Sequence, residues 1–151
     1  MEQRFLIVRV GEHRIALPEP SLVEVARAVA LTSVPSTSRD LVAGVCNLRG
    51  KVTVVLDLRG RFGEPTLPPR PSDALVFLVA HGRTVGLLVD HIDDFVPIDV
   101  ERLRPASAVS AALGDRTRMA ETADGVLVVV DVASFVAESE LDAVEAAGAS
   151  P

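Results

Sequence analysis

The chain has 151 residues, a hydrophobic fraction of 48% and a formal net charge of −6 at pH 7. A chain of this length buries roughly 70% of the surface that its unfolded form exposes, which is enough for one domain with a real core. The acidic balance and the absence of Trp and Tyr argue against a nucleic-acid partner, which requires clustered cations and usually stacking surfaces. The single cysteine, Cys46, excludes an internal disulfide framework.

The apolar runs of the chain are short. None approaches the length of about 20 residues that a membrane-spanning helix needs. The N-terminal sequence MEQRFLIVRVG also lacks the basic, apolar and small-residue pattern of a signal peptide. We therefore expect no direct membrane insertion and a cytoplasmic location.

The first half of the chain has mostly the pattern of β-structure. Residues 4–10 and 13–18 are two apolar runs separated by Gly11 and Glu12, which predicts a hairpin. Residues 21–30 have apolar side chains at helical spacing, but their β-branched residues are equally compatible with a strand. Residues 45–48 and 51–58 predict a second pair of strands with a tight turn between them.

Residues 63–73 contain four prolines and one glycine, a composition typical of a linker. Strand patterns resume after it. The strand patterns fall at 74–80, 84–90 and 92–100. A connection of small residues follows at 104–118, then a turn at Asp124–Gly125 with one more buried strand, and the chain ends with a predicted helix within 132–151.

About ten short strands on either side of the linker predict a mainly β fold made of two small packed barrels or sheets. Each half is too small to be stable alone, so we expect one domain over residues 1–138. The first barrel would span about 1–64 and the second about 74–138. Residues 139–151 would form a flexible or helical tail.

Several carboxylates and a histidine offer the materials of an acid–base or metal site, notably Asp57, Asp90 and His91. The simpler interpretation is structural, because Asp57, Asp90 and Asp131 each end an apolar run, where a carboxylate can accept hydrogen bonds from free backbone N–H groups. The sequence contains no recognisable catalytic motif and no histidines at ligand spacing. We expect no enzymatic activity, no metal and no cofactor.

The stretch CNLRGKV, residues 46–52, places Arg49 at the tip of a predicted hairpin, with Gly50 available for a positive φ. An arginine in such a turn can simply keep it solvated. However, Glu24 lies in the otherwise apolar segment LVEVARAV, and burying a lone carboxylate is costly without a cation. We therefore predict that Glu24 pairs with Arg49.

The stretch GVCNLRGKVTVVLDLRGRFG, residues 44–63, resembles the signature of CheW-type chemotaxis coupling proteins. Further stretches resemble other parts of that family in the same order. They are FLIVRVGEHRIALP, SLVEVARA, VPSTSRDLVAGV, TVGLLVDHIDDFVPI, LRPA and DGVLVVVDVASFV. The resemblance covers about residues 4–137, and the ordered set is more specific than any single piece.

The resemblance implies two packed five-stranded β-barrels and a non-enzymatic adaptor. Such an adaptor bridges the cytoplasmic helical tip of a methyl-accepting chemoreceptor and the regulatory domain of a CheA-type histidine kinase, in arrays at the membrane. Arg49 and Glu24 match residues that support a receptor-binding groove between the barrels. The other implied site residues are Leu22, an apolar neighbour in the groove, and Asn47, Leu48 and Gly50, which shape the turn. Kinase-binding residues are not assigned.

One stretch departs from the family pattern. Before the final strand the sequence reads RTRMAETADG, with Arg118, Met119 and Ala120 where the family usually has a Gly-Ile pair. The connection at 106–115 also lacks large side chains. An alternative function is therefore a binding module in a non-flagellar chemosensory pathway, controlling pili, gliding or gene expression, with a different principal partner.

Overall fold

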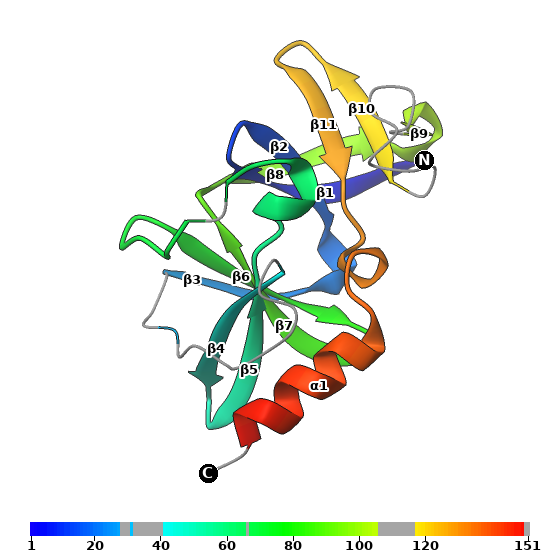
Figure 1. Cartoon of the computed structure of the whole chain (residues 1–151). Coiled ribbons are helices and arrows are strands. Elements are labelled where there is room, and N and C mark those ends of the chain that lie inside the picture. Colours follow the sequence, from blue (N-terminus) through cyan, green and yellow to red (C-terminus); the bar gives the residue numbers. More distant parts are fainter. Residues whose placement is uncertain (28–30, 32–40, 66, 106–116, 150–151) are drawn as a thin grey trace.

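A computed structural model describes residues 1–27, 31, 41–65, 67–105 and 117–149. The described strands form two sheets, shown in the upper and lower parts of Figure 1. Sheet A has the strand order β8-β1-β2-β11-β10-β9, and sheet B has the order β3-β6-β7-β5-β4. The strands of sheet A are β1 (Glu2–Val10), β2 (His13–Pro18), β8 (His91–Asp99), β9 (Arg104–Pro105), β10 (Arg118–Thr122) and β11 (Gly125–Val129). Those of sheet B are β3 (Leu22–Arg27), β4 (Val42–Leu48), β5 (Lys51–Leu56), β6 (Ala74–Ala80) and β7 (Arg83–Val89).

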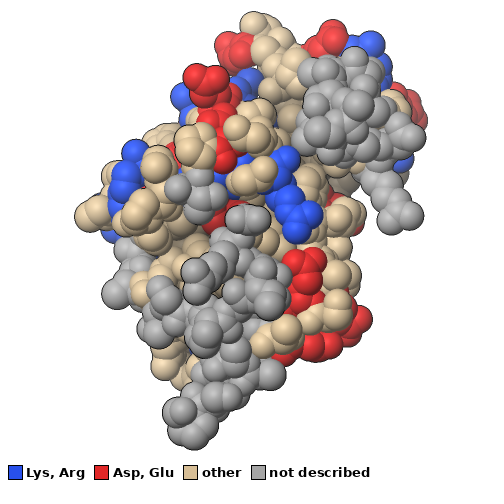
Figure 2. Space-filling view, in the orientation of Figure 1, with Lys and Arg blue, Asp and Glu red and all other residues tan. Residues whose placement is uncertain are grey.

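Short helices connect the strands, and one longer helix ends the chain. The short ones are η1 (Glu19–Ser21), η2 (Arg59–Phe62), η3 (Val100–Arg102) and η6 (Val132–Ser134), and the longer one is α1 (Glu138–Ala149). Helix α1 packs against β5 and inserts the fully buried Leu141 into the core. Figure 2 shows acidic residues over the first part of this helix, whose first turn carries Glu138 and Glu140.

The expected mainly β fold is confirmed. The two hairpins of the first half form as predicted, with Leu6 opposite Leu17 in one and Leu48 opposite Lys51 in the other. The ambiguous segment 21–30 is a strand at Leu22–Arg27, because backbone pairing with β6 outweighs its helical spacing. Residues 28–30 lie outside the described part of the chain.

The expected division of the strands at the proline linker is wrong. Sheet A combines the N-terminal hairpin with strands after residue 90, since β8 pairs with β1 and β11 pairs in parallel with β2. Sheet B uses the contiguous stretch 22–89. The reason is that β1 buries side chains on both faces, so it needs a neighbouring strand on each side and cannot remain at an edge. One sheet also has six strands instead of five, the sixth being the two-residue β9.

The buried apolar residues form three clusters. The largest lies between the sheets and includes Val8 of sheet A and Leu87 of sheet B. Each sheet also encloses a smaller cluster on its other face, around Ile7 in sheet A and around Phe77 in sheet B. Because the central strands of each sheet bury side chains on both faces, the two sheets curl like barrels around their own small cores and share a third core.

A cluster of charged side chains lies where β5 and β7 end beside the linker. Arg59 is 2% exposed, and its guanidinium contacts three carboxylates. It donates a hydrogen bond to Asp90, and it lies 3.4 Å from Asp57 and 3.7 Å from Asp73. Arg70, half-exposed, pairs with Asp73 at 3.1 Å and with Asp90 at 3.2 Å. We call these five residues the Arg59 cluster.

The Arg59 cluster joins the two sheets and the linker. Asp90 accepts a hydrogen bond from the backbone N–H of Gly11, in the β1–β2 turn, at 2.6 Å. The backbone N–H of Asp90 donates to the carbonyl of Arg9 at 2.8 Å. Arg59 also donates to the carbonyl of Leu67 in the linker at 3.4 Å. The cluster therefore fixes how the end of sheet B meets the first turn of sheet A.

Two carboxyl groups of the cluster, those of Asp57 and Asp90, have opposite pKa shifts. Burial raises the pKa of Asp57, and the N–H and guanidinium of Arg59 offset this only in part. Burial would also raise the pKa of Asp90, but hydrogen bonds from Arg59 and Gly11 outweigh burial and lower it. Arg59 thus stabilises the ionised form of Asp90 more than that of Asp57.

Replacing Arg59 by Met should lower the free energy of unfolding by about 3–5 kcal/mol, because three carboxylates would lose their buried cation. Arg70→Met, at the half-exposed cation of the same cluster, is the matched control and should cost much less. Urea unfolding of both variants at neutral pH measures the difference. Equal costs would show that Arg59 does not hold the cluster together.

Asp90→Asn should destabilise the protein more than Asp57→Asn at pH 7. The lowered pKa of Asp90 contributes stability that is present above the unfolded-state pKa of about 3.9 and is lost as pH falls through the folded-state pKa. The raised pKa of Asp57 has the opposite sign, since stability falls as pH rises from about 3.9 to the folded-state value. The gap between the variants should therefore shrink in urea titrations at lower pH, and a constant gap would contradict this assignment.

Candidate functional site

The Arg49 turn is a two-residue hairpin loop between β4 and β5. Both central residues have positive φ, 53° at Arg49 and 85° at Gly50, as type I′ hairpin turns require. Asn47 Oδ1 accepts a hydrogen bond from the backbone N–H of Gly50 at 2.7 Å, which holds the loop. Glycine adopts this backbone region freely, but an arginine there is strained, and such strain tends to occur at functional positions.

The predicted ion pair between Glu24 and Arg49 is present. Arg49 Nη2 lies 3.0 Å from Glu24 Oε1. The Glu24 side chain is 28% exposed and the Arg49 side chain 77% exposed. Within the described residues Glu24 Oε1 accepts no aligned hydrogen bond, so this ion pair is its polar contact. One side of the guanidinium is held by Glu24, and the rest of it faces solvent.

The ion pair bridges the two edges of sheet B. Glu24 lies on β3, at one end of the strand order, and Arg49 follows β4, at the other end. Glu24 is directly opposite Phe77 in the register, so it points to the face of the sheet that encloses the small core. Both partners thus belong to one sheet. The resemblance implied that the pair supports a groove between two barrels. In the structure, the two edges of sheet B hold the pair in place.

Apolar side chains next to the ion pair are exposed. Val23 and Val25 flank Glu24 in the sequence of β3 and are 45% and 52% exposed, with Val25 on the opposite face of the sheet from Glu24, and Val52 follows the Arg49 turn at 54%. The sequence analysis did not single out these valines, although their alternation with Glu24 was visible. Leu22, predicted as the apolar site residue, is half-buried and packs against the shared core instead. Leu48 is half-buried against the core of sheet B.

A separate ion pair joins sheet A to the segment just before β3. Arg4 Nε lies 3.2 Å from Glu19 Oε2 in η1, which leads directly into β3. The Arg4 guanidinium also stacks over the ring of Phe95 on β8, with 4.8 Å between Arg4 Cζ and the ring centroid. Phe95 is 39% exposed. Arg4 therefore links an exposed aromatic side chain of sheet A to the segment that precedes β3.

The acid–base site that the sequence analysis considered and set aside is not assembled among the described residues. Asp57 and Asp90 are brought together, but Arg59 neutralises them in the cluster described above. His91 is mostly exposed and pairs with Asp93 at 3.3 Å. Asp131 accepts a hydrogen bond from the backbone N–H of Ala133 at 3.2 Å, as the structural interpretation predicted. Within the described residues, no group of three or more potential ligands is placed to hold a metal ion.

Two further features bear on reactivity and location. Cys46 is buried, and burial raises the pKa of its thiol, which is typical of an inert cysteine. Across the part of the chain that the structure describes, no helix has the length and apolar character needed to cross a membrane.

Known proteins are similar to this chain in sequence and in fold. Residues 4–140 match the CheW-like domain family. A chemotaxis protein CheW of Klebsiella aerogenes is 27% identical over 145 residues, covering 95% of this chain and 87% of that protein. Protein FrzA of Myxococcus xanthus is 36% identical over 107 residues, covering 69% of this chain and 64% of that protein.

A solved structure agrees with these matches. The scaffolding protein TtCheW from Thermoanaerobacter tengcongensis superposes with a TM-score of 0.75 at 26% identity, covering 87% of this chain and 90% of that one. The resemblance inferred from the sequence is confirmed. With a family match over nearly its whole length and the fold of a scaffolding protein, the chain belongs to the CheW-like domain family, whose members are chemotaxis scaffold and adaptor proteins, not enzymes.

Proposed function

We propose that this protein couples chemoreceptors to a CheA-type histidine kinase and binds the helical cytoplasmic tip of a methyl-accepting receptor beside the Arg49 turn. The observation that carries this proposal is the Glu24–Arg49 ion pair. It holds an exposed guanidinium in a turn with a strained backbone. Such strain costs free energy and tends to be kept where the residue has a function.

The surroundings of the ion pair suit a helix. A helix that binds a surface contributes apolar anchors, and a fixed charge sets its orientation. Val52 supplies an exposed apolar side chain next to the turn, Val23 and Val25 add exposed apolar side chains on β3, and Phe95 adds one on β8. Asn47 and Gly50 contribute by fixing the turn. Weak contacts of this kind become effective in multivalent arrays at the membrane.

The second proposed partner is the regulatory domain of the kinase. We assign it no residues, but we expect it to bind away from the Arg49 turn, since an adaptor must hold both partners together. The similarity to protein FrzA, a relative that is not named CheW, favours a non-flagellar chemosensory pathway as the alternative setting. Deleting the gene and measuring swimming and surface movement separately would distinguish the two settings.

Arg49→Asn should weaken binding of a purified receptor cytoplasmic fragment by about tenfold or more, because a positioned charge-assisted contact is lost. Asparagine tolerates positive φ, and Arg49 is largely exposed, so the free energy of unfolding should change by less than about 1 kcal/mol. Arg49→Lys should restore binding only in part, because the planar fork is lost. Titration calorimetry measures binding, and urea unfolding measures stability.

Lys51→Gln is the matched control, because it removes an exposed cation from the β4–β5 hairpin without touching Glu24. Binding of the kinase regulatory domain should survive in every variant. If Arg49→Asn bound the receptor fragment as tightly as the unchanged protein does, the Arg49 turn would not be the receptor-binding site. A failure of the unchanged protein to bind either partner would overturn the function itself.

A further inference from the structure

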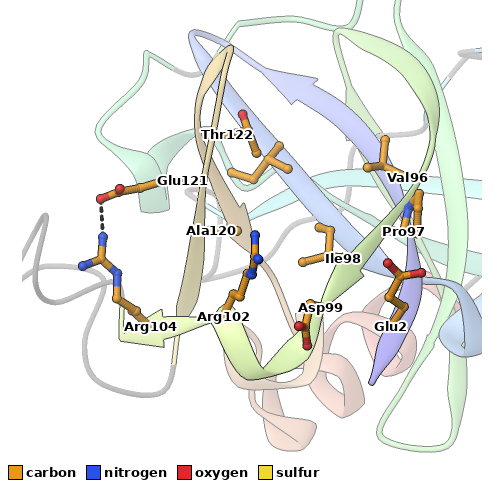
Figure 3. A pocket seen from close by; sticks show the side chains of 11 residues that line it. Glu2, Val96, Pro97, Ile98, Asp99, Arg102, Arg104, Ala120, Glu121 and Thr122 are labelled. Carbon is orange, nitrogen blue, oxygen red and sulfur yellow. Dashed lines mark hydrogen bonds and ion pairs between the residues drawn. The ribbon is translucent and has the colours of Figure 1, made fainter.

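A cavity of about 500 Å³ opens in sheet A, whereas the Arg49 turn belongs to sheet B. It lies between the two edges of the curled sheet, with β8 on one side and β10 and β9 on the other (Figure 3). Sheet B has its edges bridged by an ion pair, whereas sheet A has this cavity in the corresponding place.

The floor of the cavity is apolar and lined by small and medium-sized side chains. Ile98, Ala120 and Leu127 are 8%, 7% and 1% exposed, and all three belong to the inner core of sheet A. Val96 and Pro97 form one wall. The rest of the lining is polar and charged, so the cavity combines an apolar floor with a polar rim, and the mouth of a barrel is a common place for a small-ligand site.

Most of the charges at the rim already have partners. Arg104 pairs with Glu121. Asp99 accepts hydrogen bonds from the N-terminal amine at 3.3 Å and from the backbone N–H of Glu101 at 3.1 Å. Among the described residues, Glu2 and Arg102 take part in no hydrogen bond or ion pair, although Arg102 lies close enough to Asp99 to help lower the pKa of that carboxyl.

Arg102 and Glu2 occupy different places at the rim of the cavity. Figure 3 shows the Arg102 side chain between the two edges of the sheet, directed toward Ala120, whereas Glu2 lies beside Pro97. A ligand whose apolar part rests on the floor would therefore meet the guanidinium first. Arginine recognises carboxylates through a planar fork of donors.

We propose that this cavity binds a small amphipathic carboxylate. The apolar body of the ligand lies on Ile98, Ala120 and Leu127, and its carboxylate pairs with Arg102. The Glu2 carboxylate repels an anionic ligand and so limits its affinity. Neutralising Glu2 therefore tests the sign of the ligand's charge. The site shares no residue with the Arg49 turn, so it does not depend on the proposed function.

The test uses three probes with the same apolar chain: octanoate and octylamine below their micelle concentrations, and 1-octanol below its solubility limit. Methyl NMR spectra of the full-length protein should shift at Ile98 and Leu127, and octanoate should bind about tenfold more tightly than protonated octylamine. Arg102→Gln should lower the affinity for octanoate about tenfold, and Glu2→Gln should raise it.

Two further variants control the test. Arg118→Gln makes the same charge change on β10 outside the cavity and should leave octanoate binding unchanged. Ala120→Leu should fill the floor and abolish binding of all three probes, with circular dichroism confirming the fold. Absence of octanoate binding, tighter binding of octylamine, or equal effects of the changes at Arg102 and Arg118 would each overturn the proposal.

Discussion

The Arg59 cluster is the constraint on which the arrangement of the two sheets depends. A guanidinium with three carboxylates around it is stable in a protein interior only when all its partners stay in place. These partners come from the end of β5, the end of β7 and the linker, and Asp90 also holds the β1–β2 turn through Gly11. Displacing any one of these segments would leave a buried charge uncompensated, so the cluster fixes one relative position of the sheets.

The two curled sheets solve the problem of their open edges differently. In sheet B the Glu24–Arg49 ion pair spans from β3 to the β4–β5 turn, outside the backbone pairing. In sheet A the edges leave a cavity with an apolar floor. Arg49 keeps most of its side-chain surface exposed in this ion pair, which is why we propose it as a recognition element. An adaptor gains from this combination, because it needs rigid surfaces and no moving catalytic groups.

Much of the fold was predictable from local pattern. Two apolar runs with a glycine-containing turn specify a hairpin wherever they occur, and the pairing of Glu24 with Arg49 followed from the cost of a lone carboxylate in an apolar segment. The Arg59 cluster was not predictable in the same way. Asp57 and Asp90 each looked like a strand-end hydrogen-bond acceptor, and nothing local indicated that one arginine, 31 residues before Asp90, would join them. The exposed valines beside Glu24 also look like core residues until the position of β3 at an edge is known.

By itself, the sequence determined the strands, the tight turns, the acidic balance and the signature that places the chain in its family. Only the tertiary structure decided that the N-terminal hairpin joins the last strands, that β3 and β4 form opposite edges, and that sheet A is left with a cavity. The physical reason is the range of the interactions involved. Hydrophobic period and turn chemistry act between near neighbours along the chain, whereas sheet order, ion pairing and cavities depend on which distant surfaces exclude water together.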